Sequence, residues 1–310
     1  MKSAIVTGAN GFVGGALVRE LLENNYVVYA VIHRERKDRL SEHPRLQLIS
    51  AELSEIERLC QYVPTLESGL FFHLAWEGSA GEARSNASLQ LKNAEWSVRA
   101  LQTAKMLGCN RFIGAGSIME HETIAATFTP GNRPGMAYIY GDGKLTAHLM
   151  CSSVAAKLGI DLVWPVITNA YGIGEISPRI VNATLRKCLN GTAPEFTSAT
   201  QNYDFVYVDD AARAFRLIGE RGKAFHEYVI GSGAAKPLRE FLLEMRETVA
   251  PKLEFRFGSV PFTGINLPLE IFDTASTAED CGFKPSVSFP EGCRMTYEWL
   301  KKVSDYDSTL

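Results

Sequence analysis

The chain has 310 residues, of which 46% are hydrophobic and 22% charged, and its formal net charge at pH 7 is −3. This composition is typical of a globular protein and excludes disordered and low-complexity chains. Without an excess of basic residues we expect no nucleic acid partner. The longest apolar run, Tyr26 to Ile32, is shorter than the roughly 20 residues of a membrane span, so we expect no membrane partner. Six widely spaced cysteines without a Cys-x-x-Cys pair favour a reducing, cytoplasmic location and no metal site.

The first 165 residues alternate short apolar runs with helical patterns. Continuous apolar runs are typical of strands in a parallel sheet that is covered on both faces. The expected strands are Ser3–Thr7, Tyr26–His33, Leu46–Ser50, Gly69–Leu74, Arg111–Ala115 and Asp161–Pro165. The expected helices are Gly11–Glu23, Ser54–Tyr62, Ala83–Leu107 and Tyr138–Leu158. This alternation predicts an α/β fold with a Rossmann-like, doubly wound parallel sheet.

The pattern becomes less regular after Pro165. The expected helices there are Pro178–Asn190, Asp210–Glu220, Leu238–Val249 and Glu291–Val303. The expected strands are Phe205–Val208, Tyr228–Ile230 and Glu254–Phe257. We therefore predict one domain over residues 1–165, to which segments near 205–230 return, and a smaller, irregular domain over residues 166–310.

A glycine-rich segment, Thr7-Gly-Ala-Asn-Gly-Phe-Val-Gly14, joins the first strand to the first helix. In this pattern Gly8 permits a tight turn, Gly11 lets a pyrophosphate approach the backbone, and Gly14 lets the helix pack closely on the sheet. The N–H groups of the helix N-terminus favour an anion there. The alternative is a glycine-rich turn without a ligand, but the strand before it and the helix after it favour dinucleotide binding. The expected cofactor contacts are Gly8, Asn10, Gly11, Phe12, Val13 and Gly14.

The end of the second strand indicates which dinucleotide binds. An acid there would bond the 2′-hydroxyl of NAD, whereas arginine would accommodate the 2′-phosphate of NADP. The sequence reads His33-Arg34-Glu35-Arg36-Lys37, with no acid at the strand end. We therefore expect His33 and Arg34 to bind NADP, with NAD as the alternative cofactor and a solvated basic loop as the alternative without a ligand. Glu52, after the third strand, is expected near the adenine.

Two Tyr-x-x-x-Lys sets occur, Tyr140 with Lys144 and Tyr297 with Lys301. Tyr140 follows a strand that ends near Ser117, at the carboxyl edge where open α/β sheets bind ligands. Tyr297 lies in the last amphipathic helix, where we expect it to pack on the core. Four-residue spacing places Tyr140 and Lys144 on one helix face, where an ammonium would lower the pKa of the phenol. Tyr140 is then a proton donor to a carbonyl oxygen, which Ser117 would hold, unless the pair is only a surface contact.

The chain resembles the extended short-chain dehydrogenase/reductase family, the nucleotide-sugar epimerase, dehydratase and reductase group. The resemblance rests on the order along the chain of the glycine segment, Ser117, Tyr140 and Lys144. Other similar segments are His73-Leu-Ala-Trp76, Asn93, Thr168-Asn-Ala-Tyr-Gly172 and Asp204-Phe-Val-Tyr-Val-Asp-Asp210. The tail from Glu227 to Pro285 resembles NDP-4-keto-6-deoxyhexose reductases of the CDP-abequose synthase kind. The resemblance covers most of the chain, and it implies dinucleotide binding by residues 1–165, mainly substrate binding by residues 166–310, and a homodimer. The cofactor contacts that it adds are Leu74, Ala75, Tyr140, Lys144 and Ile167, and the substrate contacts that we expect are Trp76, Met119, Thr168, Asn169, Arg179 and Tyr203.

The sequence also departs from that family. Dehydratases of the group carry Asp-Glu directly after the serine, where this chain has Ile118 and Met119. Glu120 and His121 follow, either as a shifted acid and base or as an exposed polar loop. Many relatives have arginines at the positions of Val166 and Tyr203 here, so Arg179 and Arg294 are candidates to replace them in holding the diphosphate. Glycines at 141 and 143 predict that the helix carrying Tyr140 has a frayed start.

These features favour an NADPH-dependent reductase that acts on the 4-keto group of a nucleotide-linked deoxy sugar. A 4-epimerase with tightly bound NAD would use the same three residues and is the alternative enzyme. A catalytically silent NADP-binding regulator is a further alternative, although it would have no need of Ser117, Tyr140 and Lys144 together.

Overall fold

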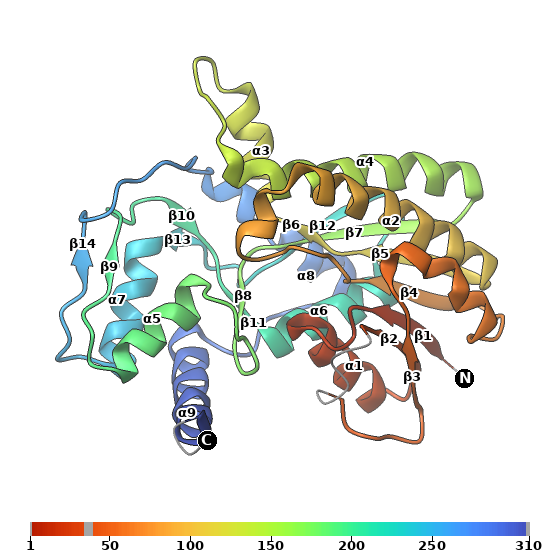
Figure 1. Ribbon diagram of the computed structural model, residues 1–310, viewed down its shortest axis with the longest axis horizontal. Helices are drawn as coiled ribbons and strands as arrows, with labels where there is room; N and C mark the ends of the chain where they lie inside the picture. Colours follow the sequence, from red (N-terminus) through yellow and green to blue (C-terminus); the bar gives the residue numbers. More distant parts are fainter. Residues whose placement is uncertain (1, 34–39, 308–310) are drawn as a thin grey trace.

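The computed structural model describes residues 2–33 and 40–307, with side chains described as far as residue 303. Its central sheet is parallel, in the order β12-β7-β5-β4-β1-β2-β3, with the short β6 beside β7 (Figure 1). The strands are β1 (Ser3–Thr7), β2 (Val27–Ile32), β3 (Leu46–Ser50), β4 (Gly69–His73), β5 (Cys109–Gly114), β6 (Gly116–Ser117), β7 (Asp161–Ile167) and β12 (Glu227–Ile230). This arrangement confirms the predicted Rossmann-like, doubly wound sheet.

Helices cover both faces of the sheet (Figure 1). One face carries α1 (Phe12–Glu23), α6 (Val208–Arg221) and α8 (Ala275–Cys281), and the other carries η1 (Leu53–Gln61), α2 (Ala87–Met106) and α4 (Ile139–Leu158). Successive residues of one strand therefore pack in the two different hydrophobic cores, one on each face of the sheet. In β1, Ala4 and Val6 pack beneath α1 and α6, whereas Ile5 packs beneath α2 and α4. Because both faces are buried, the strand sequences are apolar without alternation.

The other elements lie mostly on the left of Figure 1. Phe205, Phe241 and Phe289 form a cluster with ring centroids 4.9 to 5.1 Å apart, and this cluster is continuous with the core beneath α1 and α6. The helical elements are α3 (Met119–Phe128), α5 (Ile180–Leu189), α7 (Leu238–Val249), α9 (Phe289–Asp307), η2 (Glu82–Ser85), η3 (Met136–Tyr138) and η4 (Leu269–Phe272). The short strands pair as β8 (Ala170–Tyr171) with β11 (Val206–Tyr207), β9 (Glu195–Phe196) with β14 (Arg256–Phe257), and β10 (Asn202–Tyr203) with β13 (Lys236–Pro237).

The expected frayed start of α4 is wrong. The helix begins at Ile139, and Gly141 and Gly143 are buried inside it. A Cβ on Gly141 would lie 2.2 Å from the Thr123 hydroxyl oxygen, and one on Gly143 would lie 2.9 Å from the Gln90 Cβ. The glycines therefore let α3 and α2 pack closely against the helix turn that carries Tyr140.

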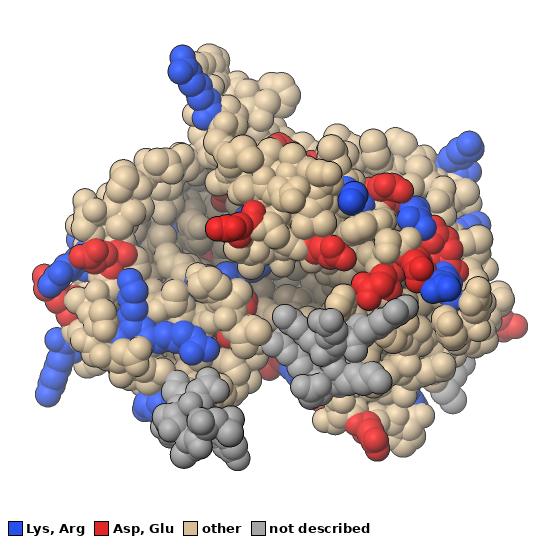
Figure 2. All heavy atoms as spheres, viewed as in Figure 1, with Lys and Arg blue, Asp and Glu red and all other residues tan. Residues whose placement is uncertain are grey.

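Acidic and basic side chains are interspersed on the face seen in Figure 2, without a continuous basic area among the residues coloured there. No helix of residues 2–33 and 40–307 has both the length and the apolar character that crossing a membrane requires.

Candidate active site

The turn of residues 7–14 between β1 and α1 is shaped by close backbone contacts. Gly8 has a φ of +68°, and a Cβ there would lie 2.8 Å from the Ala75 nitrogen. A Cβ on Gly14 would lie 2.1 Å from the Gly8 oxygen, so neither position has room for a side chain. Gly11 is the N-cap residue of α1 and has no side chain that could cap the helix. The first N–H groups of a helix have no partner within the helix, so the turn fits the pyrophosphate of a dinucleotide.

The loop after β4 lies directly against this turn. The Leu74 N–H donates to the Thr7 carbonyl oxygen at 3.3 Å, and the Ala75 N–H donates to the Thr7 hydroxyl oxygen at 3.2 Å. Asn10 is buried, and Val13 lines the large cavity described below. The fold therefore brings these four predicted cofactor contacts to one edge of the sheet.

The ends of β2 and β3 also meet at this edge. His33 Nε2 lies 3.2 Å from Glu52 Oε2, so a carboxylate from the segment that follows β3 reaches the end of β2. The sequence pattern predicted no acid at the strand end, because it considered only the residues of that strand. Arg34, on which the NADP prediction depends, lies outside the described residues.

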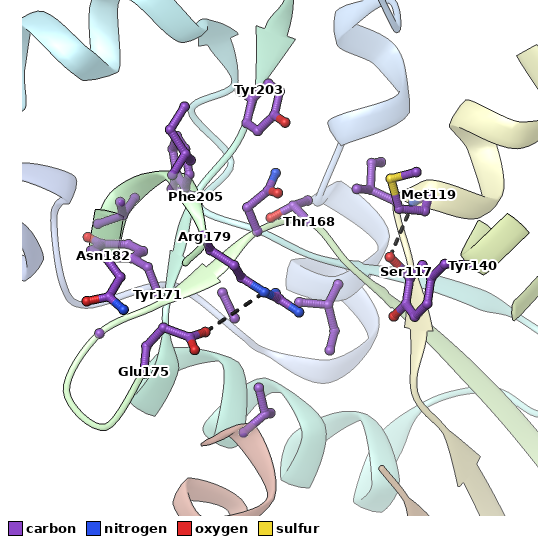
Figure 3. A pocket seen from close by; sticks show the side chains of 18 of the residues that line it. Ser117, Met119, Tyr140, Thr168, Tyr171, Glu175, Arg179, Asn182, Tyr203 and Phe205 are labelled. Atoms are coloured by element: carbon purple, nitrogen blue, oxygen red, sulfur yellow. Dashed lines mark hydrogen bonds and ion pairs between the residues drawn. The ribbon is translucent and has the colours of Figure 1, made fainter. Parts of the chain in front are cut away.

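A cavity of about 280 Å³ opens next to the carboxyl ends of β6 and β7. Ser117 and Tyr140 lie on one side of it, and Arg179 reaches toward them from the opposite side (Figure 3). Lys144, Trp76 and Arg294 do not line it. The predicted site residues that line this cavity are Val13, Ser117, Met119, Tyr140, Ile167, Thr168, Asn169, Arg179 and Tyr203.

Lys144 lies behind Tyr140 rather than in the cavity. Ser117 and Tyr140 lie side by side at the cavity wall. Lys144 Nζ donates to the Ala115 carbonyl oxygen at 2.8 Å and lies 3.8 Å from the centre of the Trp76 ring. The same nitrogen is 5.9 Å from the centre of the Tyr140 ring. Trp76 therefore packs on Lys144 and does not line this cavity, so its expected contact with the substrate stays a prediction.

Burial is the largest cause of the pKa shifts of Tyr140 and Lys144. It raises the pKa of Tyr140, although the charges of Arg179 and Arg84 and the nearby Ser117 side chain oppose this rise. It lowers the pKa of Lys144 to about 7, and the charge of Glu120 opposes that fall. The predicted lowering of the Tyr140 pKa is wrong for this arrangement, because Lys144 is directed at the Ala115 carbonyl and the phenol is enclosed.

Glu120 is not in an exposed loop, one of the two expectations for it. Its carboxylate is buried at the start of α3. Oε1 accepts from the Ser117 N–H at 2.9 Å and from the Trp164 indole N–H at 3.2 Å, and Oε2 lies 3.1 Å from His148 Nδ1. His121 is 3.1 Å from Glu227, so it does not join this cluster. Glu120 therefore fixes the backbone of Ser117 from behind and does not line the cavity.

Sequence reasoning missed two charged residues that line the cavity. The Arg84 guanidinium carbon lies 4.3 Å from the centre of the Tyr140 ring. Burial raises the pKa of Glu122 to about 7, and the charge of Arg84 opposes this rise. No motif marks either position, because Arg84 lies in the segment between β4 and α2 and Glu122 lies on a helix that was not predicted.

We expect Glu120→Gln to lower the pKa of Lys144 below its value in the unmodified protein. The variant keeps an oxygen that can accept from Ser117 but removes the buried negative charge that favours the ammonium form. NMR titration of lysine labelled at Cε measures this pKa directly. Glu122→Gln is the matched control on the same helix, because Glu122 faces Arg84. An equal change in the two variants would contradict this account.

Comparisons with known proteins agree with this fold. A dTDP-glucose 4,6-dehydratase from Salmonella typhimurium is 20% identical, covering 95% of this chain and 91% of its own. The solved UDP-N-acetylglucosamine 4-epimerase from Methanobrevibacter ruminantium, in complex with UDP-N-acetylmuramic acid, has a TM-score of 0.80 at 20% identity and covers 97% and 99% of the two chains. The Bordetella bronchiseptica enzyme WbmF, in complex with NADH, has a TM-score of 0.79 at 20% identity, covering 99% and 94%. The model of the NAD dependent epimerase/dehydratase family matches residues 4–231. The chain therefore belongs to this family of NAD(P)-dependent enzymes, as its glycine segment and its Ser117, Tyr140 and Lys144 set predict.

Proposed function

We propose that this protein reduces the 4-keto group of a nucleotide-linked deoxy sugar with NADPH. The observation that carries the proposal is the position of Ser117 and Tyr140, which lie together on the wall of the cavity that Val13 of α1 also lines. A carbonyl held there is next to a proton donor and next to the turn that fits a dinucleotide.

The space beside the cavity supports a nucleotide-linked substrate. A second hollow of about 280 Å³ shares Ile180 and Tyr203 with the first and is also lined by Lys187, Phe196 and Gln201. In this proposal the sugar lies beside Tyr140 and the nucleotide extends past Tyr203. Residues 1–165 hold the cofactor and residues 166–310 hold most of the substrate.

The roles of the three residues follow from their contacts. When bound, the nicotinamide cofactor supplies the hydride. Ser117 holds the carbonyl oxygen, and Tyr140 donates the proton that this oxygen gains as the carbonyl is reduced. Its raised pKa keeps the phenol protonated and suits a donor. Lys144 neutralises the phenolate that forms, and the Ala115 carbonyl orients it.

Two observations bear on the choice of reaction. Glu120 is bound to Ser117, Trp164 and His148, so it is not positioned as the second acid or base that 4,6-dehydration needs. This favours a substrate that is already dehydrated when it binds. The 4-epimerase is the second candidate, favoured by the fold of the Methanobrevibacter enzyme and by the Glu52 carboxylate at the end of β2, which suits NAD.

Net reduction is the first expected outcome. The protein, NADPH and an NDP-4-keto-6-deoxyhexose should give stoichiometric loss of reduced-nicotinamide absorbance and a 4-hydroxy product, identified by NMR, that retains its nucleotide. Interconversion of UDP-glucose and UDP-galactose without added cofactor, with no NADPH consumed by any keto-sugar, would instead assign the protein as an epimerase.

Tyr140→Phe should lower turnover by roughly two to four orders of magnitude, the usual contribution of a positioned proton donor. Cofactor binding should survive, because only the hydroxyl is lost. Tyr297→Phe is the matched control, since Tyr297 contacts Lys301 on α9 and packs against the core. Similar losses in both variants would show that the choice between the two tyrosines is wrong.

We expect NADPH to bind about tenfold more tightly than NADH, a difference of about 1.4 kcal/mol. Arg34 is the proposed contact for the 2′-phosphate, so Arg34→Gln should remove most of this difference. Titration of both cofactors by intrinsic fluorescence measures the four dissociation constants. Equal values for the two cofactors in the unmodified protein would favour NAD and therefore the epimerase.

A further inference from the structure

The cavity contains a guanidinium that has no acidic partner in the part of the chain that the structure describes. Arg84 and Arg179 are the basic side chains among the residues that line the cavity. Arg179 Nε lies 3.9 Å from Glu175 Oε2, at the limit of an ion pair. The Arg84 side chain has no hydrogen bond and no ion pair with a described residue. Glu122 is near it, but burial brings the pKa of this acid to about 7, so Glu122 is only partly charged at neutral pH.

The segment that carries Arg84 is held firmly in place. Gln90 of α2 donates from Nε2 to the carbonyl oxygens of Gly78 and Ala83, at 3.2 and 3.1 Å. Asn93, one helical turn later, accepts from the Glu77 N–H and donates to its carbonyl oxygen, both at 2.9 Å. Gln90 and Asn93 are each 1% exposed. Arg84 is therefore positioned by buried amides and is not on a free surface loop.

The position of Arg84 limits what it can bind. Its guanidinium covers the ring of Tyr140 at 4.3 Å, and the charges of both Arg84 and Arg179 favour the phenolate form of Tyr140. A partly buried cation costs free energy unless an anion pairs with it. An anion that pairs with Arg84 is therefore beside the phenol that donates the proton.

We propose that Arg84, together with Arg179, binds an oxyanion of the substrate next to the reacting carbon. The inference rests on the proposed function in one respect, that the substrate is a nucleotide sugar. Planar guanidinium groups bind carboxylate and phosphate oxygens in pairs, so the oxyanion is either the diphosphate or a carboxylate on the sugar. Among the described residues that line the cavity, Arg84 and Arg179 are the ones that carry a cationic side chain.

Binding measurements distinguish the two sources. The probes are UDP, UDP-glucose and UDP-glucuronic acid, with the dTDP, CDP and GDP diphosphates and glucose conjugates as replacements if another base binds better. Dissociation constants are measured by calorimetry for the unmodified protein, Arg84→Met and Arg84→Lys. Arg133→Met is the control, because Arg133 is exposed and does not line the cavity. NADPH affinity and thermal melting of each variant show whether the fold is retained.

Arg84→Met should weaken binding at least tenfold, and Arg84→Lys should recover only part of the loss, because lysine keeps the charge without the paired donors. An equal loss for all three probes assigns the diphosphate as the oxyanion, whereas a loss confined to UDP-glucuronic acid assigns a sugar carboxylate. Constants for Arg84→Met within twofold of the unmodified protein would overturn the inference and leave the proposed reduction intact. If nucleotides bind through Arg84 but no keto-sugar is reduced, the proposed reaction fails and the oxyanion site stands. If no nucleotide binds the unmodified protein, both fail.

Discussion

The buried carboxylate of Glu120 is the contact on which the geometry of the candidate site depends. A carboxylate removed from water is stable only when hydrogen bonds and charge replace its hydration. Here the Ser117 N–H, the Trp164 indole and His148 provide those hydrogen bonds. The His148 ring also stacks on Trp164 with centroids 4.9 Å apart. One side chain thereby joins β6, β7, α3 and α4, and it fixes the strand end from which Ser117 faces the cavity.

The parallel sheet explains why the other groups collect at the same place. The carboxyl ends of β1, β2, β4, β6 and β7 lie along one edge, where α1 also begins with backbone N–H groups that have no partner within the helix. Close packing brings α4 to this edge, because Gly141 and Gly143 remove the side chains that would keep α3 and α2 away. Tyr140 therefore reaches Ser117 from a helix that local propensity alone would have disfavoured.

The parts of the site that could be predicted are those encoded by neighbouring residues. The glycine segment, the strand that leads to Ser117 and the four-residue spacing of Tyr140 and Lys144 are all local patterns, and the cavity contains both Ser117 and Tyr140. The parts that could not be predicted depend on contacts between distant segments. Glu120 on α3 pairs with His148 on α4, Glu52 after β3 contacts His33 after β2, and Arg84 contacts Tyr140 only after folding. Residue spacing carries no information about such pairs, and the pKa of Tyr140 was misjudged because its burial was unknown.

Burial also explains why the ionisation states of the charged groups at this site depend on one another. In a partly enclosed cavity each charge is weakly screened, so the ionisation of one group depends on the others. Lys144 with a pKa of about 7 and Glu122 with a pKa of about 7 are both close to changing charge under ordinary conditions. An oxyanion that binds at Arg84 would neutralise a charge that now favours the phenolate of Tyr140. Such an anion would keep the phenol protonated until the carbonyl oxygen requires its proton, so the group that binds the substrate also prepares the proton donor.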